Sequence, residues 1–493
     1  MAPPNLLFIF TDEQRYDTLR AYGNSRIHTP NLNRLAEQSC VIERAYVTQT
    51  VCTPSRSSIM TGLYPHSNGC TENNVPLSAG VPCLAEMLRG DHETAYFGKW
   101  HLGDEIFAQH GFEHWRSIED GYHKYYSPGR DQNSRSTYHN WLLEHGVKPA
   151  DGSRFGRGEA ARLPERLGKP AYLAGEAERF IRDSANRPFA LYVNFLEPHM
   201  PFYGPRDDEH DPDTEVYLPE NFQHPPTEDQ PLKTRLFERK YYHSGHDGME
   251  LKTEADWRRI RANYWGLCSL VDTHVGRILR TLEDCGLSEN TIVVYTSDHG
   301  DMMGSHRLLA KCVQFEEAAR VPLMIRLPGQ TTGRRIAGPV SQIDLVPTLL
   351  ELMGEDVPDN LQGRSLKPIL TDDSRGEAGN DVFLEWNGPN CGLAADVVGK
   401  VELPEELKAY ATVEEAADAI RDPVRTVVSR DGWKLNVSPK RGEHELYDLN
   451  SDPLELNNLA PQGDQKDRMN DLLGRIRDWQ RRTEDTVELP DRL

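Results

Sequence analysis

The sequence lacks any hydrophobic run long enough to cross a bilayer, which takes about 18–20 consecutive apolar residues. The apolar run Leu6-Leu7-Phe8-Ile9-Phe10 is also too short for the core of a signal peptide, and neither a basic start nor a small-residue cleavage site accompanies it. These absences predict a cytoplasmic protein with no membrane partner. A signal peptide removed from a longer precursor is the alternative.

Runs of basic residues are missing as well. The formal net charge is −21, and no segment rich in Lys and Arg is long enough to follow a phosphate backbone. The sequence therefore argues against nucleic acid or an anionic membrane surface as a partner.

Cysteine is sparse. The eight cysteines among 493 residues form no CxxC pair, which argues against a disulfide scaffold and against a zinc site. Most of them are expected to be small buried hydrophobic residues: Cys40, Cys70, Cys83, Cys268, Cys285, Cys312 and Cys391. Only Cys52 has neighbours that indicate a chemical role.

What the chain does contain is an alternation of short apolar runs and segments with helical spacing. Such alternation is typical of a sheet whose strands are joined by helical crossovers. The strand candidates are residues 6–10, 94–97, 190–195, 291–295 and 322–325, and the helix candidates are residues 31–38, 84–89, 171–182, 256–284 and 342–353. We predict an α/β fold with a large mixed, mostly parallel sheet flanked by helices.

The length predicts two domains, because single hydrophobic cores stop growing at about 250–300 residues. Beyond about residue 375, residues 426–429 and 433–437 alternate around Gly432 as in a hairpin, and residues 466–482 predict a terminal helix. We expect a large α/β domain over residues 1–375 and a smaller α+β domain with an antiparallel sheet over residues 376–493. Residues 201–248 are expected to form a long insertion or lid.

Polar residues directly follow four of the predicted strands, where ligands of such sheets bind. These strand ends are Asp12-Glu13, Gly98-Lys99-Trp100-His101, Glu197-Pro198-His199 and Asp298-His299. We expect the four groups to lie together and to carry the chemistry.

The segment Cys52-Thr53-Pro54-Ser55-Arg56, followed by Thr61-Gly62, resembles the signature of the type I, formylglycine-dependent sulfatases of the alkaline-phosphatase-like superfamily. In that family an accessory formylglycine-generating enzyme oxidises the cysteine to formylglycine. One oxygen of its geminal diol attacks sulfur, and the other later expels sulfate. The resemblance implies that Cys52 is the precursor of the nucleophile and that Arg56 belongs to the catalytic group.

The local sequence agrees with this resemblance. The segment after Cys52 has helical character, which would place the nucleophile at a helix N-terminus, where backbone N–H groups favour anions. Arg56, one turn further, would face the same side of the helix.

Two acidic groups resemble the metal-binding elements of the family. Asp12-Glu13 stands where the family usually has two adjacent aspartates, and Gln14 is a further candidate ligand. Asp298-His299, followed by Gly300, resembles the other half of the site. The resemblance implies that one divalent cation is bound by Asp12, Glu13, Asp298, His299 and the modified Cys52. Oxygen ligands favour Ca²⁺, and the imidazole leaves Mg²⁺ or Mn²⁺ as alternatives.

The remaining matches supply positive charge and histidines. Gly98-Lys99-Trp100-His101 resembles the G-K-W-H segment, in which Lys holds a sulfate oxygen and His acts as the base on the diol. His199 matches the histidine beside the ester oxygen, and Lys311 matches the second sulfate-binding lysine. Arg56, Lys99 and Lys311 are expected to make a positive pocket in this acidic protein.

Two matches are weaker. Asn73 lies where related enzymes place a polar contact to the anion, although an ordinary loop asparagine fits equally well. Residues 445–453 resemble a C-terminal segment common in sulfatases, whose role there is structural.

The resemblance implies hydrolysis of sulfate monoesters, arylsulfatase-like, with a carbohydrate sulfatase as the second reading. The nearest rival is a phosphonate monoester or phosphodiester hydrolase, in which uncharged hydroxyl residues replace the lysine and histidine of the G-K-W-H segment. Lys99 and His101 therefore favour sulfate. A non-catalytic relative would lack a catalytic group, and none is missing.

The expected partners are a small-molecule or saccharide sulfate ester and the maturation enzyme. Whether the protein forms a homo-oligomer is left open by the sequence. The identity of the ester should depend on the loops over residues 121–163 and 201–248, with the C-terminal domain as a further candidate, and none of these carries a decodable motif.

Overall fold

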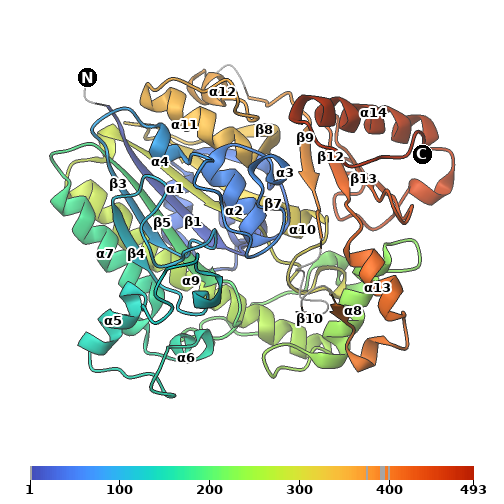
Figure 1. Ribbon diagram of the computed structural model, residues 1–493, viewed down its shortest axis with the longest axis horizontal. Coiled ribbons are helices and arrows are strands. Elements are labelled where there is room, and N and C mark those ends of the chain that lie inside the picture. The colour runs from blue at the N-terminus through green and yellow to red at the C-terminus, as the bar shows by residue number, and fades with distance from the viewer. Residues whose placement is uncertain (1–2, 373–375, 389–394, 398–399) are drawn as a thin grey trace.

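The structure is a computed structural model that describes residues 3–372, 376–388, 395–397 and 400–493. Its centre is a sheet of strand order β4-β3-β5-β1-β6-β7-β2-β8 (Figure 1). The strands are β1 (Asn5–Asp12), β2 (Cys40–Tyr46), β3 (Glu93–Gly98), β4 (His114–Ser117), β5 (Phe189–Pro198), β6 (Thr291–Ser297), β7 (Arg320–Arg326) and β8 (Arg334–Ser341). Only β7 runs antiparallel to its neighbours, β6 and β2. The predicted mixed, mostly parallel sheet is confirmed.

Both faces of the sheet are buried, as the alternation along β1 shows. Leu6, Phe8 and Phe10 enter the core on one face, whereas Leu7 and Ile9 enter the core on the other. The first core is covered by α2 (Cys52–Thr61), α4 (Leu84–Met87) and α11 (Leu345–Met353), and the second by α1 (Pro30–Ala36), α7 (Lys169–Asp183) and α9 (Glu254–Asp284). The predicted flanking helices are therefore present, on both faces.

A second, antiparallel sheet lies beside the first near the C-terminus (Figure 1). Its order is β14-β13-β12-β9, from β9 (Val382–Glu385), β12 (Arg425–Val428), β13 (Trp433–Val437) and β14 (Glu445–Asp448). Leu472 and Ile476 of α14 (Lys466–Thr483) pack against Val427 and Leu435 of this sheet. The hairpin turns at Gly432, whose φ is +87°, as its sequence predicts.

The predicted boundary between residues 375 and 376 adjoins residues outside the described part, and the division into two domains stays a prediction. Cys391 also lies outside it. The other seven cysteines form no disulfide within the described part of the chain.

Residues 201–248 form a packed layer around α8 (Leu232–Ser244). Phe202, Phe222 and Phe237 from this stretch are buried in one cluster with Trp257 and Trp265 of α9. The predicted insertion thus contributes to the core. Further elements are α3 (Pro65–Asn68), α5 (Thr137–Glu144), α6 (Arg157–Ala161), α10 (Glu316–Ala319), α12 (Lys367–Thr371) and α13 (Val413–Ile420), with a small ladder of β10 (Ala395–Val397) and β11 (Lys400–Glu402).

Within the described residues, no helix combines the length and the apolar character that crossing a bilayer requires.

Candidate active site

Four neighbouring strands bring the predicted polar groups to one edge of the sheet. Strands β3, β5, β1 and β6 are consecutive and parallel, so their carboxyl ends lie side by side. Asp12 ends β1, while Lys99, His199 and Asp298 directly follow β3, β5 and β6. The expected convergence of the four strand ends is confirmed.

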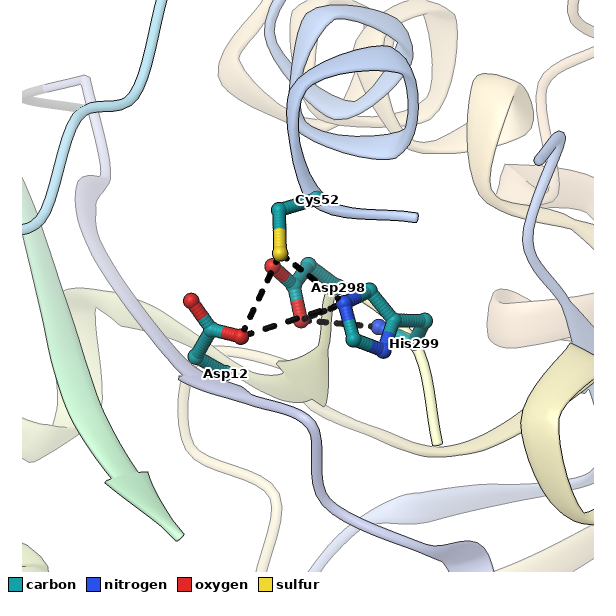
Figure 2. Close-up of side chains that lie close together, drawn as sticks. All are labelled: Asp12, Cys52, Asp298 and His299. Atoms are coloured by element: carbon teal, nitrogen blue, oxygen red, sulfur yellow. Dashed lines mark hydrogen bonds and ion pairs between the residues drawn. The ribbon is translucent and has the colours of Figure 1, made fainter. Parts of the chain in front are cut away.

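Cys52, the first residue of α2, faces this edge. Figure 2 shows its side chain pointing toward those of Asp12, Asp298 and His299. The Sγ atom lies 3.1 Å from His299 Nε2 and 3.7 Å from Asp12 Oδ1. One potential ligand atom from each of the four residues lies within 4.8 Å of all the others, and all four residues are buried. Two carboxylates, an imidazole and the Cys52 side chain therefore surround one point.

Arg56 holds the two carboxylates in place from behind Cys52. Its Nη2 donates to Asp12 Oδ2 and its Nε to Asp298 Oδ2, each at 2.8 Å. Its Nη1 donates to Lys99 O at 2.8 Å and to Asn194 Oδ1 at 2.6 Å. Arg56 is only 1% exposed, its guanidinium is engaged on all sides, and it is not among the residues that line the cavity. Its predicted part in the positive pocket stays a prediction.

Glu13, the residue that departs from the family pattern, points toward two of the predicted anion-binding residues. Its Oε2 lies 2.7 Å from Lys311 Nζ and 3.4 Å from His199 Nε2. The other oxygen, Oε1, is buried and has no hydrogen-bond partner among the described residues. Burial raises the pKa of Glu13 to about 8 despite the nearby Lys311 ammonium. Asp12, Glu13 and His199 form a second group of potential ligands that shares Asp12 with the first.

Gln14 is occupied elsewhere. Its side-chain oxygen accepts hydrogen bonds from Thr11 and Tyr295, and its amide nitrogen donates to Thr18. The structure therefore places it outside both groups of potential ligands.

The charges near Cys52 keep Asp12 ionised. Burial by itself would raise the pKa of Asp12, but Lys99, which forms an ion pair with its Oδ2, holds that pKa well below the ordinary value. The same pair raises the pKa of Lys99 against the effect of burial. Both groups are thus charged at neutral pH.

Two of the three predicted site histidines, His101 and His199, are held neutral. Burial and the Lys99 ammonium lower the pKa of His101 well below its ordinary value, and burial and Lys311 do the same for His199. His101 donates from Nε2 to Asn74 Oδ1 at 3.0 Å, which leaves its Nδ1 as the acceptor nitrogen. His199 Nδ1 donates to Met200 O at 2.7 Å.

Asn73 and three residues that sequence reasoning missed shape the surroundings. Asn73 Oδ1 accepts from the Thr53 backbone N–H at 3.0 Å, at the start of α2. The missed residues are Asn74, which contacts His101; Asn194, which contacts Arg56; and Glu105, which accepts from the Trp100 and His101 backbone N–H groups. The sequence could have indicated Asn194, because it is a polar residue inside an apolar strand run. Asn74 and Glu105 had none.

The site around Cys52 opens onto a cavity of about 410 Å³. Its inner wall consists of Cys52, Asn73, Asn74, Lys99, His101, His199 and Lys311, and its outer wall of Glu119, Asp120, Gly121, Tyr122, Lys124, Tyr125, Phe155, Gly156 and Arg157. The predicted residues other than the buried metal-binding group and Arg56 are therefore accessible to one ligand.

Comparison with known proteins agrees with this geometry. The family model described as Sulfatase matches residues 4–355. The chain is 24% identical to an N-acetylglucosamine-6-O-sulfatase of Bacteroides thetaiotaomicron, over 98% of this chain and 87% of that protein. It is 30% identical to a choline-sulfatase of Rhizobium meliloti, over 93% of this chain and 82% of that protein.

The fold is also similar to that of a solved structure, the phosphonate monoester hydrolase SpPMH from Silicibacter pomeroyi. The TM-score is 0.76 at 21% sequence identity, over 97% of this chain and 96% of that one. The resemblance first suggested by the Cys52 segment is confirmed by the match to the family model and by the relatives. The chain belongs to the sulfatase family of the alkaline-phosphatase-like superfamily and is a sulfuric ester hydrolase.

Proposed function

We propose that this enzyme hydrolyses sulfate monoesters with a formylglycine made from Cys52 and one divalent cation. The observation that carries the proposal is that Lys99 and His101 line the same cavity as Cys52 and Lys311. Lysine and histidine at these two positions favour sulfate over phosphonate esters. The rival, a phosphonate monoester hydrolase with the same nucleophile, is similar in fold but is expected to have uncharged residues there.

The residues around Cys52 fit a cation. The carboxylates of Asp12 and Asp298 converge with His299 Nε2, and the orphaned Oε1 of Glu13 offers one more oxygen nearby. Asp12, Asp298, His299 and the modified Cys52 would hold the ion, with Glu13 as the fifth ligand, and the oxygen-rich set favours Ca²⁺ over Mg²⁺ or Mn²⁺. When bound, the cation would polarise the sulfate oxygens, and the aldehyde hydrate of Cys52 would supply the attacking oxygen.

The chain's own residues would bind and orient the ester. Lys99 and Lys311 are the cations that face the cavity nearest Cys52, and they would hold the sulfate oxygens. His101, neutral and with Nδ1 as its acceptor nitrogen, can take up a proton there. Lys311 and His199 both contact Glu13 Oε2, and either of them would donate a proton to the leaving oxygen of the ester. Arg56 is a positioning residue that fixes the carboxylates.

The carrier of the sulfate is proposed to be a small aryl group or a sugar. Relatives named N-acetylglucosamine-6-O-sulfatase and choline-sulfatase show how broad the choice is within the family. Maturation would require a formylglycine-generating enzyme as a partner.

Two measurements test the proposal. Mass analysis of the tryptic peptide that ends at Arg56, from protein co-produced with a maturation enzyme, should show the aldehyde or its hydrate in place of the Cys52 thiol. Release of product from an aryl sulfate and from the matching aryl phosphonate, compared on one preparation, should favour the sulfate by at least about tenfold. An unmodified thiol from a competent host, or a large preference for the phosphonate, contradicts the proposal.

A further inference from the structure

We infer that the outer half of the cavity is a second anion-binding subsite, so that the preferred substrate is a sulfate ester whose carrier bears another anionic group, a carboxylate or a second sulfate. The inference rests on the proposed function, because it assumes that the inner half holds the scissile sulfate. Its chemistry is carried by Arg157, Lys124, Tyr122 and Tyr125.

The outer subsite is continuous with the catalytic residues. The Tyr122 ring lies 4.5 Å from the His101 ring, between centroids, and both residues line the cavity. Arg157, the first residue of α6, donates from Nη2 to the Tyr122 hydroxyl at 2.7 Å. A ligand that reaches from the inner to the outer half therefore passes along Tyr122 to the guanidinium.

The acidic residues of the outer wall are already neutralised or turned to other partners. Glu119 forms ion pairs with both Lys169 and Arg157. Asp120 accepts from the Ser136 backbone N–H with Oδ1 and contacts His139 Nδ1 with Oδ2, each at 2.7 Å. Neither carboxylate is thus left to attract a cationic ligand.

Positive charge, by contrast, remains available. Lys124 is exposed, its Nζ lies 5.0 Å above the Tyr125 ring, and within the described part of the chain it forms no ion pair. The Nη1 group of Arg157 likewise has no hydrogen-bond partner in the described residues, since Nε and Nη2 make its contacts. An arginine with a free Nη1 group and an exposed lysine nearby are suited to a carboxylate or a sulfate.

The aromatic residues indicate the shape of the carrier. Tyr122 and Tyr125 present ring surfaces beside these cations, and flat apolar faces of this kind pack against aryl rings and the apolar faces of sugars. The subsite therefore fits a ring with an anionic substituent. It disfavours a quaternary ammonium such as choline, for which the wall offers positive charge and no free carboxylate.

The test compares two probes of the same shape that differ in one charge: 4-carboxyphenyl sulfate and 4-carbamoylphenyl sulfate, with the 3-substituted pair as a second geometry. For at least one geometry, the ratio of kcat/KM for the carboxylate to that for the amide should fall about tenfold in Arg157→Gln and about threefold in Lys124→Ala. The loss in the two variants should appear mainly in KM. In the wild type, the preference for the carboxylate probe should shrink with added salt.

Matched variants separate the subsite from general effects. Arg162→Gln removes a neighbouring charge that lies over Tyr203, outside the cavity wall, and should leave the ratio unchanged. Arg157→Lys keeps the charge and should retain part of the preference. A ratio that is the same in the wild type, Arg157→Gln and Lys124→Ala for both geometries overturns the inference.

Failure of the proposed function is distinguishable. If the matured enzyme releases sulfate from none of the probes, the proposed function falls, and calorimetric binding of 4-carboxyphenyl sulfate to Cys52→Ala decides the subsite separately. Weaker binding in Cys52→Ala/Arg157→Gln than in Cys52→Ala supports it, and equal affinities, or no binding to Cys52→Ala, overturn it.

Discussion

Lys311 Nζ lies 2.7 Å from Glu13 Oε2, so the residue that departs from the family pattern is paired with a proposed sulfate-binding lysine. Glu13 is fully buried and Lys311 is 9% exposed. Burial nevertheless raises the pKa of Glu13 to about 8, so without a cation its carboxyl group is largely neutral at pH 7.

Glu13→Gln should therefore change the free energy of unfolding of the metal-free protein at pH 7 by less than about 1 kcal/mol and weaken binding of the cation at least about tenfold. Denaturant unfolding and a Ca²⁺ titration followed by calorimetry measure the two effects. Glu13→Asp, which keeps a carboxyl group on a shorter side chain, should lose less affinity for the cation. Wild-type metal affinity in Glu13→Gln would remove Glu13 from the ligand set.

Arg56→Lys should lower kcat/KM by at least about a hundredfold although it keeps the charge. One ammonium cannot span Asp12 and Asp298 as the guanidinium does, so both carboxylates would lose their alignment. The measurement is sulfate release together with metal content. Arg320→Lys, at a half-buried arginine that contacts Glu43 O, controls for the loss of a hydrogen-bonded guanidinium and should retain most activity.

Removal of the cation should abolish turnover and lower the melting temperature. Asp12 and Asp298 would then face each other across Cys52 without the ion, with Arg56 and Lys99 as their remaining counter-charges. Dialysis against a chelator, elemental analysis and thermal melting before and after addition of Ca²⁺, Mg²⁺ or Mn²⁺ test this. Full activity in protein shown to contain no divalent metal would contradict the assigned site.

Gly98→Ala should destabilise the enzyme and displace Lys99. Gly98 ends β3 with a φ of +127°, and a Cβ atom there would lie 1.9 Å from Asn194 O of the adjacent strand. Gly175→Ala is the matched control, because this glycine lies in α7 with nothing within 4 Å of its Cβ position. The control should raise stability by about 1 kcal/mol, whereas Gly98→Ala should lower both the melting temperature and activity. Equal melting temperatures of the wild type and Gly98→Ala would contradict this prediction, because they would show that β3 and β5 can separate without cost.

The ion pairs of Glu119 should make stability depend on acid pH. Burial opposes ionisation, but Arg157 and Lys169 depress the pKa of Glu119 to about 2 from its ordinary 4.5. A depressed pKa contributes stability that is present above the unfolded value and is lost as pH falls through the folded value. The contribution should therefore be complete above pH 4.5 and vanish toward pH 2.

Glu119→Gln should lower the free energy of unfolding by about 3 kcal/mol at pH 6, and by progressively less as the pH falls below 4.5. Urea unfolding at pH 6 and pH 3.5 measures the difference. Glu283→Gln, at an exposed pair with Arg34, should change stability by less than about 1 kcal/mol at both values. A Glu119→Gln deficit that is the same at both pH values would refute the assignment.

Sequence patterns predicted the strands that carry the site, because these are buried on both faces and appear as continuous apolar runs. They missed β2, β4 and β8. Glu43 and Arg44 interrupt β2, β4 has only 4 residues, and β8 begins with Arg334 and Arg335. At the margins of the sheet, charged residues can point to solvent and the apolar signal is lost.

The same limit applies to the site. Residues in recognisable segments, such as Lys99 and His299, were predicted from the sequence alone. Arg56 was placed on the correct face of its helix. Its hydrogen bonds, however, go to Asp12 and Asp298, which are distant in sequence and meet Arg56 only in the folded protein. Tyr122 stands in a loop and Arg157 begins the short helix α6, and neither belongs to a recognisable pattern, so only the structure shows that they share a wall with Cys52.

The burial of Cys52 limits the time at which the proposed oxidation of this residue can take place. At 1% exposure, beneath a cavity walled by segments from residue 52 to residue 311, the thiol lies out of reach of another protein's active site once the chain has folded. Any partner that oxidises Cys52 must therefore act on the nascent or unfolded chain. Under the proposed maturation, oxidation of Cys52 and folding of the chain would compete in time, and a chain that folds first would remain inactive.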